Sequence, residues 1–195
     1  MSYTSHFPVF SKGLHMSGGF TISASVCPTD HATILLAIAA RLRHDIPDLF
    51  GSETTCFISD TAWPGVEVMD ETFCTVHPAD SDFDPKLPIG AGNLGIVENG
   101  IFHVTVWSRL MTDQIEHSVL ALTDATRGAL KLKQRVLASL AGQQIYADIP
   151  TNSVPLLLTW LRPLKAMHPH SRQGDGDFTS FSIAFLGPFI WNLTG

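Results

Sequence analysis

Residues 101–109, IFHVTVWSR, alternate between apolar and polar side chains. Phe102, Val104 and Val106 fall on one face of this stretch, and polar residues such as His103 fall on the other. This period of two is typical of a strand that buries one face. The segment therefore predicts a β-strand in contact with a core.

The period changes after this strand. From residue 115 the apolar positions are separated by threes and fours, which is the spacing of a helix that buries one stripe. These positions are Ile115, Val119, Leu122, Ala125, Ala129, Leu132, Val136 and Leu140. A capping box at Asp113 and Glu116 and a glycine at Gly142 mark the predicted ends. The helix would be roughly 40 Å long, and Gly128 inside it, costing about 1 kcal/mol relative to alanine, predicts a kink or a close contact there.

A first helix is predicted at residues 29–46. Thr29 or Asp30 can cap it, and Pro47 ends it because α geometry is disfavoured before proline. The stripe that it would bury is Leu35, Ile38, Ala39, Leu42 and Ile46. Short strands are predicted at 54–59, 65–69 and 73–76, because these segments are rich in β-forming residues.

The remaining segments complete the predicted organisation. Residues 1–28 have no sustained period and are expected to form an N-terminal arm, followed by a single domain at 29–195 with a long loop at 77–95. A closing β-hairpin is expected after Pro150, with Gly187 and Pro188 bending or bulging its last strand. The predicted fold is α+β: a mixed, mainly antiparallel β-sheet packed by an N-terminal helix and one long helix.

Composition limits the possible functions. The chain has 195 residues, 45% hydrophobic and 15% charged, with a formal net charge of −6. This balance predicts no broad, non-specific attraction to DNA or to anionic lipid, and we expect no membrane partner and no sequence-specific nucleic acid. The apolar run at 34–40 is too short to span a bilayer, and residues 1–19 lack the pattern of a secretory signal. Cys27, Cys56 and Cys74 have no metal or redox spacing and are predicted to be reduced.

Two motifs fit their chemistry poorly. Gly90, Gly92 and Gly95 spell G-x-G-x-x-G, but the pattern leads into a strand, so no helix N-terminus would hold a phosphate. Asp80, Asp82 and Asp84 alternate as in a calcium-binding loop. Pro85 and Ala91 then stand where the turn glycine and the bidentate glutamate should be. We interpret the first as a glycine loop and the second as an acidic loop that is solvated or pairs with a basic patch.

A metal site is the weaker of two interpretations for the histidines near the C-terminus. His168 and His170 would share a face of a strand, and Asp175 and Asp177 follow across a turn. No third ligand is close in sequence, so exposed polar residues are favoured. No hydrolase, P-loop or zinc-protease motif occurs in the sequence, and we expect no enzyme activity and no cofactor.

The order of these elements resembles the tail terminator proteins of long-tailed bacteriophages. The resemblance covers roughly residues 29–193: an N-terminal helix, Val66-Glu67-Val68, the alternating strand at 102–107, a long helix and a terminal hairpin. Pro64-Gly65 leads into a short strand, and the alternating strand closes on an arginine before the acidic start of the long helix. The loop at 77–95 and the N-terminal arm depart from the pattern of the smallest members.

The resemblance implies a ring-forming virion protein, typically a hexamer. Such a ring caps the tail tube, stops its growth and joins it to the head–tail connector, so the expected partners are further copies of the chain, a tail tube protein and a neck or connector protein. The expected location is the tail or neck of the virion, after assembly in the host cytoplasm. The residues expected at subunit or partner contacts are Asp80, Asp82, Phe83, Asp84, Lys86, Asn93 and Arg172.

Two alternatives stay open at this point. A head-closure, neck or tail-tube subunit would share the same assembly logic. An enzyme or a small-molecule or metal-binding domain is the alternative of a different class, supported by His103, His168, His170 and the acidic turns.

Overall fold

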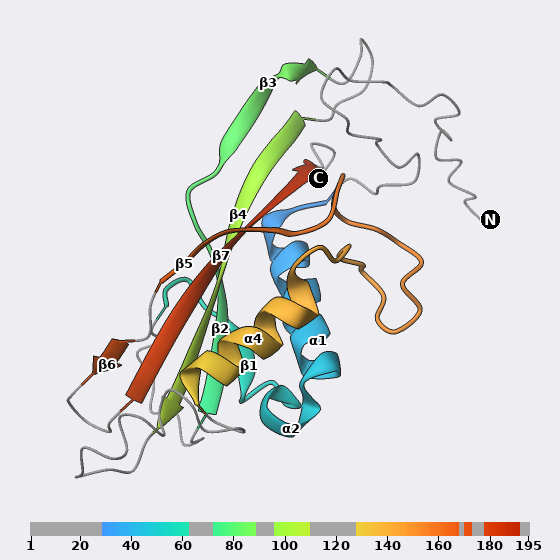
Figure 1. Cartoon of the computed structure of the whole chain (residues 1–195). Helices are drawn as coiled ribbons and strands as arrows, with labels where there is room; N and C mark the ends of the chain where they lie inside the picture. Colours follow the sequence, from blue (N-terminus) through green and yellow to red (C-terminus); the bar gives the residue numbers. More distant parts are fainter. Residues whose placement is uncertain are drawn as a thin grey trace.

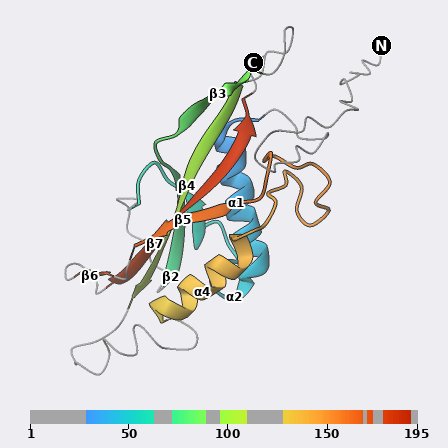
Figure 2. The ribbon, with the colours of Figure 1, turned by 45° about the horizontal axis from the view of Figure 1, so that its top comes forward.

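The chain folds around one β-sheet that carries its helices on one side (Figure 1, Figure 2). This computed structural model describes residues 29–62, 72–88, 96–109, 128–167, 170–172 and 178–191. For 84–88, 109 and 170–172 the description covers the backbone. The predicted N-terminal arm at 1–28 lies outside the described residues.

The described elements follow the predicted fold class. Three helices are α1 (His31–Asp45), α2 (Pro47–Phe50) and α4 (Ala129–Leu140). The strands are β1 (Cys56–Ile58), β2 (Thr72–Pro78), β3 (Asp82–Pro88), β4 (Ile96–Arg109), β5 (Arg162–Ala166), β6 (His170–Arg172) and β7 (Phe178–Ile190). The main path of the sheet is β1-β2-β4-β7-β5, with β3 beside β4 and β6 beside β7. Among the described strands, β1–β2 is the one parallel pair, so the α+β class with a mixed, mainly antiparallel sheet is confirmed.

Strand β4 is the centre of the sheet. It pairs with β7 without interruption from Val97 opposite Ile190 to Arg109 opposite Phe178. The face predicted to be apolar is the one beneath the helices, where Phe102 and the side chains that flank it are buried. The closing hairpin is also confirmed, because β5 and β6 both pair antiparallel with β7.

Helix α1 begins and ends where the sequence predicts. The Asp30 side chain accepts a hydrogen bond from the backbone N–H of Thr33 at 2.7 Å and so caps the first turn. Pro47 starts the next short helix, α2. The predicted stripe packs into the core: Leu35, Ile38, Ala39, Leu42 and Ile46 are all buried.

The start of helix α4 differs from the prediction, which had a continuous helix through Gly128. Gly128 is extended and occupies the N-cap, so the helix starts at Ala129. Glycine is costly inside a helix and acceptable at its N-cap, which accounts for the boundary. Gly142 follows the helix with a φ of 72°, as expected for a terminating glycine. The predicted start at Asp113 lies outside the described residues.

The structure also corrects the prediction of a long loop at 77–95, because part of this segment forms strands. Residues 77 and 78 complete β2, and Asp82–Pro88 form β3, which pairs antiparallel with β4. Proline and aspartate are uncommon in strands, and the sequence DFDPKLP therefore reads as a loop. An edge strand tolerates them because one of its sides needs no ladder.

Strand β7 has no bulge against β4 at Gly187 and Pro188, contrary to the prediction. Its register with β4 continues through Gly187 opposite Gly100 and Pro188 opposite Asn99. The Pro188 carbonyl accepts from the Leu158 N–H at 2.7 Å, away from β4. Because the N and O atoms of one strand residue point to the same edge, the missing proline N–H also faces away from β4, and the pairing is kept.

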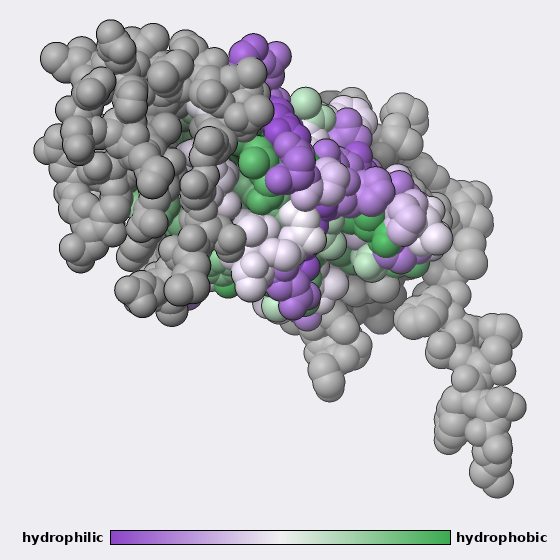
Figure 3. All heavy atoms as spheres, turned by 90° about the horizontal axis from the view of Figure 1, so that it is seen from below, coloured by the Kyte–Doolittle hydropathy of each residue, from purple (hydrophilic) through white to green (hydrophobic). Residues whose placement is uncertain are grey.

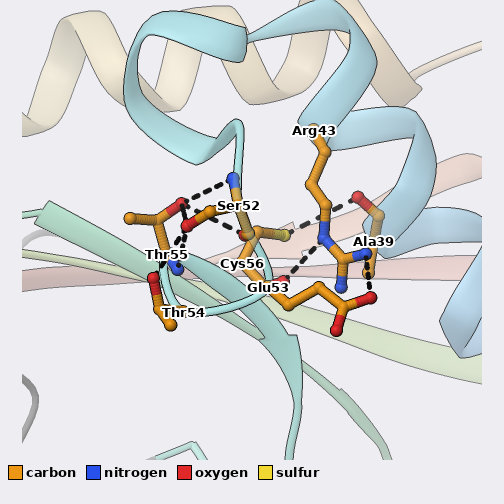
Figure 4. A network of polar contacts seen from close by, with 7 residues as sticks. All are labelled: Ala39, Arg43, Ser52, Glu53, Thr54, Thr55 and Cys56. Atoms are coloured by element: carbon orange, nitrogen blue, oxygen red, sulfur yellow. Dashed lines mark hydrogen bonds and ion pairs between the residues drawn. The ribbon is translucent and has the colours of Figure 1, made fainter.

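A polar network joins α1 to the turn before β1 (Figure 4). Arg43 donates from Nε to the Cys56 carbonyl at 2.9 Å and lies 3.5 Å from a Glu53 carboxylate oxygen. The Ser52 hydroxyl bonds the hydroxyls of Thr54 and Thr55 within the turn. These groups bond within the chain, so we interpret the network as structural.

Helix α4 is held against the N-terminal helices by two carboxylates. Arg135 forms a bidentate pair with Asp48 at 2.8 and 2.5 Å, and Ser139 donates to Asp45 at 2.8 Å. The hydrogen bond from Arg135 lowers the pKa of Asp48. These contacts orient α4 across the sheet next to α1 (Figure 2).

Candidate functional site

Four strands, β1, β3, β5 and β6, pair with a single neighbour among the described residues, and β3 and β5 are the longest of them. Strand β3 pairs only with β4, and β5 pairs with β7 and with no strand on its other side. The two strands lie on opposite sides of the β4–β7 pair. An open edge presents unpaired N–H and C=O groups that another chain can bond.

The β3 edge holds most of the residues predicted at contacts. Asp80 and Asp82 are exposed, and Phe83 is 58% exposed on the strand opposite buried Glu98. The backbone places Asp84 and Lys86 in the same strand. Asn93 lies outside the described residues. This edge is therefore acidic and carries a large exposed aromatic ring.

The β5 edge belongs to the closing hairpin, and none of its residues is among the predicted contact residues. Arg162 and Lys165 are exposed, and they pair with Leu186 and Ala184, which share the face of the sheet opposite the helices. Large apolar side chains are exposed beside them: Trp160 (61%), Leu164 (47%) and Met167 (43%). The signal in the sequence was a proline flanked by basic residues, which is typical of an edge strand.

Arg172 lies away from the other predicted contacts. It is in β6, opposite Phe178, which in turn pairs with Arg109 at the end of β4. Strand β3 pairs with the start of β4. The structure thus brings Asp80, Asp82 and Phe83 to one end of the sheet and Arg172 to the other.

Figure 3 shows a face of different character. The described residues on it are mainly hydrophilic, with small hydrophobic areas between them. Such a surface is typical of one that faces solvent. The described residues also contain no helix long and apolar enough to cross a membrane.

Glu98 is a buried carboxyl group on the helix side of the sheet. It is 1% exposed, and its oxygens accept hydrogen bonds from the Ser81 hydroxyl and from Nε1 of Trp191. His31, at the start of α1, places Nε2 3.1 Å from the same carboxyl group, outside hydrogen-bond geometry. The imidazole also packs edge-on against Phe189, with ring centroids 5.1 Å apart. Glu98 thus joins the β2–β3 turn, the end of β7 and the start of α1, which is a structural role.

A second polar cluster lies on the face opposite the helices. His77 contacts the Thr105 hydroxyl through Nε2 at 3.1 Å, and Thr105 donates to Ser182 at 3.0 Å. Ser182 lies 3.4 Å from Nδ1 of His103, and the two imidazole centroids are 5.1 Å apart. The sequence analysis treated His103 as support for an enzyme and did not connect it to His77.

This histidine cluster does not form a recognisable catalytic arrangement. Ser182 is 4% exposed, and among the described residues the hydrogen bonds of this cluster include no carboxylate that would orient either imidazole. Burial lowers the pKa of His77, with a further contribution from the charge of His103, and burial also lowers the pKa of His103. The cluster is therefore a neutral, buried network at neutral pH.

The metal interpretation is not tested by the described residues. His168, Asp175 and Asp177 lie outside them, and His170 is described only by its backbone in β6. Within the described part of the chain, no group of three or more His, Cys, Asp or Glu side chains is placed to hold a metal ion. The glycine motif at 90–95 also lies outside.

Comparison with known proteins gives remote structural likenesses. No family model and no curated protein matches this chain. Among solved structures, a chain from "Virion of native gene transfer agent (GTA) particle" is similar at 19% identity over 83% of this chain and 99% of that chain, with a TM-score of 0.44. A likeness this remote does not assign a function.

The histidine cluster predicts a loss of stability in acid. Below the ordinary histidine pKa of 6.5, the unfolded chain binds more protons at His77 and His103 than the folded chain does, because both pKa values are lowered by folding. The free energy of unfolding should therefore fall as the pH falls from about 6.5, and above that pH the contribution is fully present. Denaturant unfolding across this range should show a shallower slope for a variant with His77→Gln and His103→Gln. An unchanged slope would contradict the assignment.

Proposed function

We propose that this protein is a structural subunit of a long-tailed bacteriophage virion. It forms a ring, typically a hexamer, that terminates the tail tube and joins it to the head–tail connector. Its partners are other copies of itself, the tail tube protein and a neck or connector protein. It acts in the tail or neck of the virion after assembly in the host cytoplasm, and its role needs no catalysis and no cofactor.

The observation that carries this proposal is the pair of open sheet edges on opposite sides of one domain. Each edge combines backbone groups that are free to pair with exposed apolar side chains, Phe83 on one edge and Trp160 on the other. A subunit with two different edge strands that can pair with each other associates head to tail. Such association closes into a ring when the rotation from one copy to the next returns to the first copy. A ring leaves no lateral edge exposed.

The arrangement of the elements supports the same proposal. Helix α1, the alternating strand β4, helix α4 and the hairpin of β5 to β7 follow one another in the order that resembles tail terminators. The two buried polar clusters, around Glu98 and around His103, bond within the chain and serve the fold. Within the described part of the chain, the outer edges of the sheet are the surfaces that we propose for assembly.

Light scattering and electron microscopy test the proposal directly. The purified full chain, alone and added to tails assembled without it, is expected to form rings or to cap the tubes. Antibody labelling should place it where the tail meets the head. A protein that stays strictly monomeric and never associates with tails would contradict the proposal.

The labelled position also separates the alternatives. Label along the tube would favour a tail-tube subunit, and label on the connector alone would favour a head-closure or neck protein. If the protein is absent from particles, an enzyme becomes the better hypothesis. In that case the protein should bind or turn over a small molecule through its histidines.

A further inference from the structure

We propose that the β3 edge of one copy pairs with the β5 edge of the next copy, so that the sheet continues from subunit to subunit. The inference rests on the proposed ring and identifies the surfaces that close it. Both strands pair on one side only among the described residues, and β3 extends past the helices at the top of Figure 1.

The strand directions fit this pairing. Strands β3 and β7 both run antiparallel to β4, and β5 runs antiparallel to β7. Copies in the same orientation therefore present β3 and β5 as antiparallel neighbours, with one copy displaced along the strands because β3 lies level with residues 96–99 of β4 and β5 lies level with residues 101–104. Antiparallel pairing gives short, direct hydrogen bonds between adjacent strands.

The charges on the two edges are opposite. Asp82 pairs with Asn99. In the β4–β7 register, Asn99 lies on the same face of the sheet as Leu186 and Ala184. Arg162 and Lys165 pair with those two β7 residues. Asp82 and the two cations thus share the face opposite the helices, at opposite edges, so unlike charges face each other when copies join. Two β3 edges, both acidic, or two β5 edges, both basic, would repel each other, so the charges also oppose the pairing of like edges.

Apolar contacts add to this charge pairing. Phe83 stands exposed on β3, while Leu164 and Trp160 stand exposed at β5. Aromatic residues in the centre of an interface often carry much of its binding energy. The edge of β1 is a poorer candidate because Arg43 already donates to the Cys56 carbonyl there.

Charge reversal tests the pairing. One variant carries Asp80→Lys with Asp82→Lys, and a second carries Arg162→Glu with Lys165→Glu; each alone is expected to lose the ring peak in light scattering. All four substitutions in one chain are expected to restore it. Asp60→Lys and Lys131→Glu, at exposed sites away from both strands, serve as matched controls that keep the ring. Thermal unfolding confirms that every variant is folded.

The outcomes separate the inference from the proposed function. If the wild type forms rings and the edge variants form them equally well, the inference is wrong and the ring function stands. If the four-fold variant is folded and does not reassemble, the charge pairing is wrong. A wild type that neither forms rings nor binds tails overturns the proposed function itself.

Cysteine crosslinking gives a second measurement that does not depend on charge. In a Cys27→Ser background, Asp82→Cys and Lys165→Cys in one chain should yield a ladder of crosslinked oligomers with a bifunctional maleimide. The native Cys56 and Cys74 are buried and should not react. Either new cysteine alone should give no ladder. If the double variant also gives no ladder, the proposed pairing of β3 with β5 is wrong.

Discussion

Glu98→Ala is expected to lower the free energy of unfolding by about 3–5 kcal/mol. The substitution leaves the Trp191 N–H and the Ser81 hydroxyl without their acceptor and opens a cavity beside His31. Hydrogen bonds to a buried carboxyl group are costly to leave unmade. Urea unfolding followed by tryptophan fluorescence measures the loss.

Glu98→Gln is the matched control for this prediction. The amide keeps the volume and one acceptor oxygen, so it should cost only about 1–2 kcal/mol. If the alanine and glutamine variants were equally stable, the hydrogen bonds from Ser81 and Trp191 would not be important to the fold. The alanine variant should also lose ring assembly, because Glu98 pairs in register with Phe83 of the β3 edge.

Phe102→Ala is expected to cost about 3–5 kcal/mol of stability. Its ring is fully buried and lies 6.4 Å from that of Phe189 and 5.9 Å from that of His31, measured between centroids. It also covers Gly100, where an added Cβ would come within 2.7 Å of the ring. Removing the ring leaves a cavity that neighbouring strands cannot close, because their register fixes them.

Phe83→Ala is the control for Phe102→Ala, since it makes the same chemical change on the adjacent strand. Phe83 is exposed in a single copy, so its loss should leave the monomer's free energy of unfolding within about 0.5 kcal/mol of the wild type. It should instead weaken assembly. Equal destabilisation by the two substitutions, measured below the concentration of assembly, would contradict the placement of Phe83 at an open edge.

Local patterns predicted the elements that bury one face. The alternation around Phe102 predicted β4, and the cap at Asp30 with the proline at 47 predicted α1. These signals work because a strand or helix that buries one face repeats its apolar residues at its own period. Cys56 and Cys74 were predicted to be reduced from the lack of metal or redox spacing, and both are free thiols in the structure.

The predictions failed where a partner strand or a boundary decided the outcome. The segment DFDPKLP is a poor strand by composition and becomes β3 because β4 offers it a ladder. Gly128 fits a continuous apolar stripe, yet it is the N-cap of α4. Pro188 stays in a regular strand because its missing N–H faces away from β4, which no local pattern reveals.

The candidate site divides in the same way. The acidic residues and Phe83 were predicted as contacts from the unusual composition of their segment. The basic edge at Arg162 and Lys165 was missed because its importance depends on where β5 lies relative to β3. The links from Glu98 to Ser81 and Trp191 span 17 and 93 residues, a separation that sequence patterns do not connect.

The sequence by itself determined the fold class, the extent of α1, the core face of β4 and the absence of familiar catalytic motifs, because these depend on side-chain period and on local spacing. Only the tertiary structure decided which strands became edges, which charges share a face, and that Glu98 and the histidine cluster are internal. Strand order and register join residues far apart in the chain. The surfaces proposed for assembly therefore exist only after the sheet has formed.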